Sequence, residues 1–275
     1  MNKNLSGLED LLQHEQENSN LFDGFISDDV TSDMKAIGKL QSAIKATIHT
    51  KQVAILMQGK GKAEGNNKFP VIGLYKFASM AAVMEANIKK DDPYADYVFY
   101  NLHEEIILGR DSLKMKVAQF KNWVSKNIPP NLKLSEAINV KPLVIELKFN
   151  SALAFQLAYY ILELDEYFRL MKLAQHIALI DSKQANENIN NNCKSVRRIM
   201  NQLYTYKNTE VTRNDCAANN QIAGRAEEAM PALAPLPDEF LSGEKRSGLA
   251  PFIPTRPENQ TEEKVVVPES AELVT

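Results

Sequence analysis

Hydrophobic positions recur every three or four residues along most of this chain, and this period predicts a mostly α-helical protein. The first such stripe runs through residues 34–48 and predicts an amphipathic helix there. Residues 71–89 are apolar nearly all round, which is typical of a buried helix. Between these two segments, the period of residues 51–58 fits either a continuation of the first helix or a short strand.

A long helix is predicted to begin after Asp92, because an aspartate can cap the first backbone N–H groups and Pro93 suits the first helical turn. Its apolar stripe continues to Val124, and the prolines at 129–130 end it. A helix of this length favours a bundle or a dimer seam.

Residues 141–150 depart from the helical period and alternate apolar and polar side chains, which predicts a short strand with one apolar face. The apolar face holds Leu143, Ile145, Leu147 and Phe149, and the other face holds Val144, Glu146 and Lys148. A single strand leaves backbone N–H and C=O groups unpaired, so it needs a partner. Two partners fit the sequence, namely residues 52–57 of the same chain or the same strand of a second copy.

Two further helices are predicted after this strand. Asn150 or Ser151 can cap the first of them, which is apolar on most sides. Asp181 can cap the second, which carries an apolar stripe between Ile189 and Leu203. The predicted fold is therefore a helical domain with one short strand.

Charge is segregated along the chain, although the formal net charge is only −3. Residues 1–33 hold one lysine and eight acidic side chains, whereas residues 34–90 hold ten lysines and two glutamates. Residues 226–275 hold four basic and ten acidic side chains, with seven of the twelve prolines. Such ends bury too little apolar surface to offset the ordering of the backbone. We therefore expect mostly disordered ends around a single domain at 34–225.

The sequence argues against an enzyme and predicts neither a metal nor a cofactor. The segment HEEII at 103–107 lacks the second histidine of a zinc motif, and GKGK at 59–62 lacks the frame of a phosphate-binding loop. The two cysteines have no metal-ligand spacing, and no apolar run is long enough to cross a membrane. These features predict a soluble, cytoplasmic protein without membrane contact.

The lysines between 35 and 68 suit either a solvated surface or contacts with the phosphates of double-stranded DNA. Lysine without interleaved arginine and aromatic residues favours phosphate contact over base contact. The candidate phosphate contacts are Lys35, Lys39, Lys45, Lys51, Lys60, Lys62, Lys68, Lys141, Arg197 and Arg198.

The strand at 141–150 is the candidate for base contacts. In a ribbon-helix-helix dimer, two copies of one strand pair and enter the major groove of DNA. In that arrangement Val144, Glu146 and Lys148 would point at the bases. The alternative is an ordinary core strand that is paired within its own chain.

Several segments together resemble one known family. They are DDPYAD at 91–96, the run at 147–181, VRRIM at 196–200, VTRND at 211–215 and GEKRSGLAP at 243–251. In order and spacing they are similar to the AcaB-like family of conjugative plasmids and integrating conjugative elements, over roughly residues 45–251.

The resemblance implies a DNA-binding transcriptional activator of conjugative transfer genes with a ribbon-helix-helix-like homodimer. Promoter DNA would be its partner, and an activator would also contact RNA polymerase. The alternative is a non-enzymatic interaction protein of a conjugation or mobilisation complex, whose long helix at 93–127 and acidic tail would bind protein.

Overall fold

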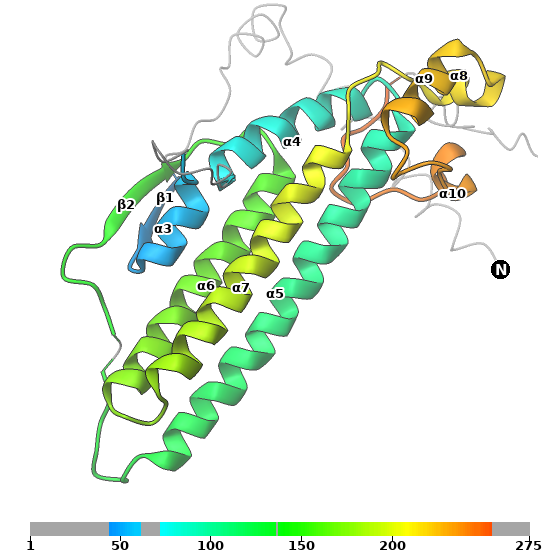
Figure 1. Cartoon of the computed structure of the whole chain (residues 1–275). Helices are drawn as coiled ribbons and strands as arrows, with labels where there is room; N and C mark the ends of the chain where they lie inside the picture. The colour runs from blue at the N-terminus through cyan, green and yellow to red at the C-terminus, as the bar shows by residue number, and fades with distance from the viewer. Residues whose placement is uncertain (1–43, 62–71, 136, 255–275) are drawn as a thin grey trace, which may run out of the picture. The chain divides into compact units, whose positions relative to one another are not determined.

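The computed structural model describes residues 44–61, 72–135 and 137–254 (Figure 1). The order of its elements is β1 (Ile44–Ile48), α3 (Lys51–Gln58), α4 (Leu74–Ile88), α5 (Pro93–Asn127), β2 (Leu143–Leu147), α6 (Ala152–His176), α7 (Ser182–Gln202), the 3-10 turn η1 (Leu203–Thr205), α8 (Arg213–Ala218), α9 (Gln221–Ala229) and α10 (Asp238–Leu241). The fold is mostly helical with a two-stranded sheet, which confirms the predicted class.

Three long helices, α5, α6 and α7, lie side by side and form the centre of the fold (Figure 1). Their facing sides meet in one apolar core, in which Phe99 and Leu113 of α5, Phe168 of α6 and Val196 of α7 are almost fully buried. Helices α3 and α4 pack against α6. The buried helix predicted at 71–89 is confirmed as α4.

The helix starts follow from local capping, as predicted. Asp92, Ser151 and Asp181 each accept hydrogen bonds from backbone N–H groups in the first turn of the helix that follows. Pro93 occupies the first position of α5. Of the two capping residues that the sequence offered for α6, the structure uses Ser151.

The helix predicted at 34–48 is wrong for its described part, because residues Ile44–Ile48 form the strand β1. Two residues four positions apart share one side of a helix and also one face of a strand, so the spacing of Ile44 and Ile48 fits both structures. Pairing with β2 selects the strand over the helix, because it gives hydrogen-bond partners to backbone groups of β2 that would otherwise have none. Residues 34–43 lie outside the described residues.

The segment after α9 differs from the mostly disordered tail that its composition predicts. Met230, Leu236, Phe240 and Ile253 are buried, and the ring of Phe240 packs edge-on against two tyrosines of α5. Prolines interrupt the helical period in this segment, so its apolar residues follow no regular pattern along the sequence. They are nevertheless buried by a helix that lies far away in the chain. Residues 255–275 lie outside the described part.

Two arginines fasten this C-terminal segment to the start of α5. The carboxylate of Asp96, which is fully buried, accepts from Nη2 of Arg213 at 2.7 Å and from Nε of Arg246 at 2.7 Å. Arg213 also donates to the backbone oxygen of Phe240, and Arg246 donates to that of Pro251. The segments DDPYAD, VTRND and GEKRSGLAP therefore meet in one buried ion-pair cluster. Their charged side chains hold the fold together and form no catalytic site.

Candidate nucleic-acid interface

Strands β1 and β2 form an antiparallel ribbon with one buried and one exposed face. In its register Lys45 lies opposite Glu146, and Thr47 lies opposite Val144. These four side chains share the exposed face, since opposite residues of an antiparallel pair point to the same side. The candidate base-contact residues therefore lie together, as the alternating pattern predicted.

The inner face of the ribbon packs on the helices. Ile145 and Leu147 of β2 are buried, and so are Ala46 and Ile48 of β1. Leu143 belongs to this face but remains 36% exposed, because it lies at the end of the ribbon. The predicted inward face is thus confirmed, except that its first residue, Leu143, remains exposed.

The structure pairs β2 with β1 of the same chain. The sequence left open a partner at residues 52–57, but these residues belong to helix α3. The partner is instead the preceding segment, Ile44–Ile48. One edge of β2 is therefore satisfied within the chain, and pairing between two copies stays a prediction.

Helices α6 and α4 hold the ribbon in place. The carboxylate of Asp165 on α6 accepts from the backbone N–H groups of His49 and Thr50 at 2.9 Å each, and from the Thr50 hydroxyl at 2.6 Å. Tyr75 of α4 donates its hydroxyl proton to the backbone oxygen of Glu146 at 3.2 Å. These contacts tie the residues that follow β1 and the last part of β2 to the helical core.

Basic side chains gather at both ends of the ribbon. Lys45 and Lys148 lie toward one end, and Lys51 and Lys141 follow and precede the strands at the other end. Asn139 brings the latter two segments together, because its side-chain amide donates to the backbone oxygen of His49 at 3.0 Å. All four lysines are exposed.

Glu146 is the one acidic side chain in residues 44–61 and 137–151, which hold five lysines. It forms an ion pair with Lys148, with Nζ and Oε2 2.9 Å apart. The lysine side chain is 76% exposed, so this pair contributes little and opens at small cost. The ribbon therefore presents a net positive surface with one carboxylate, which lies next to Lys45.

Among the described residues, the remaining predicted contacts lie outside strands β1 and β2. Arg197 and Arg198 lie on α7, and Arg198 lies against α5, 3.9 Å from the carboxylate of Glu105. Lys60 is exposed after the end of α3. Lys35, Lys39, Lys62 and Lys68 lie outside the described residues.

Thr47 is the residue of this face that the sequence pattern missed. The apolar stripe at 34–48 predicts a helix, and a helix does not place Thr47 and Lys45 on one face as the strand β1 does. The signal that could have found it is the β-branched segment IKATI, which is short but suits a strand.

Neither a metal-ligand cluster nor a membrane-spanning helix occurs in the described ranges. Within them, no group of three or more histidine, cysteine, aspartate or glutamate side chains is arranged to hold a metal ion. No helix in these ranges is long and apolar enough to cross a membrane.

The described part of the chain is thus a helical domain that carries an exposed, basic, two-stranded ribbon. The family described as "Transcriptional regulator AcaB" matches residues 36–254 of this chain. The chain therefore belongs to the AcaB family of transcriptional regulators.

One solved structure supports the fold. It is described as the crystal structure of selenomethionine-containing AcaB from uropathogenic E. coli, and it covers 73% of this chain and 96% of its own chain. The TM-score is 0.51 and the sequence identity is 14%, so the likeness concerns the fold alone. No curated protein matches the chain.

Proposed function

We propose that this regulator is a cytoplasmic homodimer that binds promoter DNA in a sequence-specific manner and activates conjugative transfer genes through contact with RNA polymerase. The observation that carries the proposal is the exposed face of the ribbon, with Lys45, Thr47, Val144 and Glu146 in register. The major groove admits a two-stranded ribbon, in which alternate side chains reach base edges.

Each side chain of this face suits a different feature of the groove. The Glu146 carboxylate can accept from the amino group of cytosine, Val144 can contact a thymine methyl group, and Lys148 can donate to guanine. Because the ribbon is complete within one chain, each protomer of a dimer would bring its own reading element. The dimer would then read two half-sites whose spacing reflects its twofold symmetry.

Substitutions on the exposed face of the ribbon are expected to reduce the preference for promoter DNA over other DNA, rather than the affinity for DNA in general. The variant with Glu146→Ala and Lys148→Ala should lose about 5- to 150-fold of its preference for its own promoter over scrambled DNA for each base contact removed, since a good base contact contributes about 1–3 kcal/mol of discrimination. Gel-shift titrations of both DNAs at one salt concentration measure this ratio.

The matched control is Lys183→Ala with Glu187→Ala, one exposed base and one exposed acid on α7. This control should keep the full preference. An unchanged preference in the ribbon variant would contradict base reading by β2.

The dimer seam is proposed on α5. Leu108 and Met115 are 66% and 61% exposed, and they lie seven residues apart on the side of α5 opposite its buried Leu113 and Val124. Trp123, which is 39% exposed, lies between this side and the buried side and stacks on Phe120. An exposed apolar stripe on a long helix suits a second helix at coiled-coil distance. The same stripe would serve the alternative function, in which the chain binds another protein of a transfer complex.

Met115→Glu is expected to convert a dimer into a monomer, because it places a charge in the centre of this stripe. Light scattering coupled to size exclusion measures the mass directly. Val83→Glu, at an exposed apolar position of α4, is the control and should leave the mass unchanged. A Met115→Glu protein that stays dimeric would move the seam to another surface, such as the outer edge of β2.

A further inference from the structure

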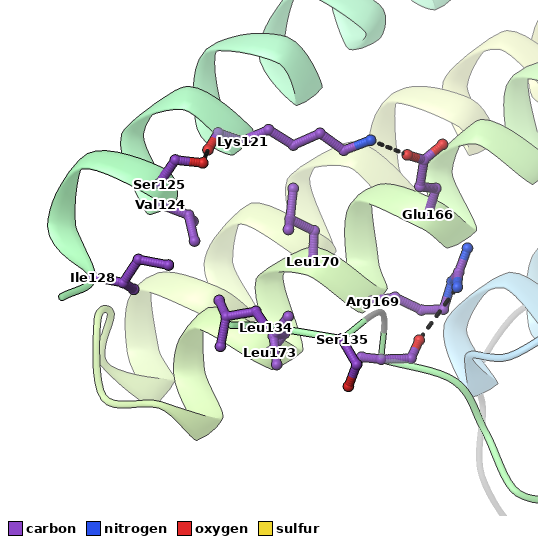
Figure 2. Close-up of a pocket in the computed structure, with 11 residues that line it drawn as sticks. Lys121, Val124, Ser125, Ile128, Leu134, Ser135, Glu166, Arg169, Leu170 and Leu173 are labelled. Carbon is purple, nitrogen blue, oxygen red and sulfur yellow. Dashed lines mark hydrogen bonds and ion pairs between the residues drawn. The ribbon is translucent and has the colours of Figure 1, made fainter. Parts of the chain in front are cut away.

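Two ion pairs link α5 to α6, and a cavity lies between these helices. Arg110 of α5 donates through Nε to Oε1 of Glu163 at 2.7 Å, and its Nη2 lies 2.6 Å from the same oxygen. Three turns further along α5, Lys121 is paired with Glu166 of α6 (Figure 2). The cavity has a volume of about 310 Å³, and Glu163, Glu166 and Lys121 are among its lining residues. This volume is at the lower end of the range of about 300–1,000 Å³ that is usual for small-molecule sites.

One carboxylate oxygen of Glu163 has no hydrogen-bond partner. Both contacts from Arg110 go to Oε1, although a guanidinium and a carboxylate can pair through two parallel bonds to both oxygens. Oε2 is buried, and no donor among the described residues reaches it. Since a buried acceptor without a donor is unfavourable, a ligand that brings an N–H group to Oε2 gains a hydrogen bond that the free protein lacks.

The two walls of the cavity carry charges of opposite sign. The α5 wall holds Lys114 and Lys121, and the α6 wall holds Glu163 and Glu166. Lys121 and Glu166 neutralise each other. Lys114 pairs weakly with Asp111 of its own helix, because the two groups are 3.7 Å apart and both side chains are more than half exposed. Lys114 can therefore turn to an anionic group of a ligand, while Oε2 of Glu163 accepts from a cationic one.

The floor of the cavity between these charges is apolar. Leu113 and Val117 of α5 line it, the first buried and the second half-buried. A short aliphatic chain would remove apolar surface from water there. We propose that the cavity binds a small apolar zwitterion of the class of the aliphatic α-amino acids. Its ammonium group donates to Oε2 of Glu163, its carboxylate accepts from Nζ of Lys114, and its side chain packs on Leu113 and Val117.

Isothermal titration calorimetry of the full chain with L-leucine tests the site without DNA. Saturable binding with one site per chain is expected. 4-Methylpentanoate lacks the ammonium group and 3-methylbutylamine lacks the carboxylate, so each should bind at least about tenfold more weakly through the loss of one charge-assisted hydrogen bond. No saturable binding of L-leucine, or equal binding of all three compounds, would overturn the proposal.

Two variants test the charged contacts separately. Glu163→Gln should weaken L-leucine by about tenfold or more but should not weaken 4-methylpentanoate, which has no ammonium group for this side chain. Lys114→Gln should weaken L-leucine to a similar extent but should not weaken 3-methylbutylamine, which has no carboxylate. A general disturbance of the fold would weaken the analogue as well. Equal losses for L-leucine and the analogue in both variants would therefore overturn the two contacts.

The space and the position of the site have their own tests. Ala118 lines the cavity with an exposed side chain, so Ala118→Trp fills the cavity from its rim and should abolish binding of L-leucine while it keeps every charge. Lys116→Gln is the matched control for Lys114→Gln, since Lys116 is exposed on the same helix but does not line the cavity, and it should bind L-leucine normally. Unchanged binding in Ala118→Trp would place the ligand elsewhere and overturn the site. None of these measurements uses DNA, so their outcome is independent of the proposed function.

Discussion

Replacing Asp96 by alanine is expected to lower the free energy of unfolding by about 3–5 kcal/mol, the usual cost of removing one partner from a buried ion pair. The side chain is fully buried and holds Arg213 and Arg246, so its loss leaves two cations without their shared carboxylate. Arg213 is itself only 5% exposed and would keep Asp91 as a carboxylate partner, whereas its Nη2 group would lose its acceptor. Urea unfolding followed by circular dichroism measures the change.

The measurement should be made at pH 7.5. Burial raises the pKa of the neighbouring Asp92 to about 6, so at pH 7.5 this capping carboxylate is ionised in every protein compared. Asp111→Ala is the matched control, since Asp111 lies on the same helix, is 63% exposed and reaches Lys114 only at 3.7 Å. It should change the stability by no more than about 0.5 kcal/mol. An Asp96→Ala protein as stable as this control would contradict the role of the cluster.

The other large effect is expected on DNA affinity. Replacing Lys45, Lys51 and Lys141 by alanine should weaken the binding of all DNA alike. It should also make the negative slope of log K against log salt shallower by about 2.7, or about 0.9 for each phosphate contact. The three lysines are exposed and lie at or beside the two ends of the ribbon. Fluorescence anisotropy over a salt series measures both quantities.

A control with the same change of charge separates local contacts from net charge. Lys89→Ala, Lys90→Ala and Lys116→Ala remove three exposed lysines from the end of α4 and from α5. This control should keep nearly the full slope, because counterion release requires direct phosphate contact. Equal losses in both triple variants would place the phosphate contacts away from the ribbon ends.

The residues of the candidate interface were predictable from the sequence where they follow a regular alternation of apolar and polar positions. Val144, Glu146 and Lys148 were placed on the outer face by alternation alone, and the structure exposes all three. Thr47 was not predictable, because its strand exists through pairing with a segment about one hundred residues later in the chain.

The sequence by itself determined the helices α4 to α7 and the starts of α5, α6 and α7. Apolar positions at helical spacing and the capping side chains of Asp92, Ser151 and Asp181 act within a few residues, so a local pattern contains them. It also determined β2, since a period of two is equally local.

Only the tertiary structure decided the partner of β2, the order of the segment after α9 and the cavity between α5 and α6. Each depends on groups far apart in the chain, such as Asp96 with Arg246 or Thr50 with Asp165. The energy of such contacts comes from burial and from hydrogen bonds that form only after the helices have packed. The spacing of residues along the sequence therefore does not show which distant residue forms each contact.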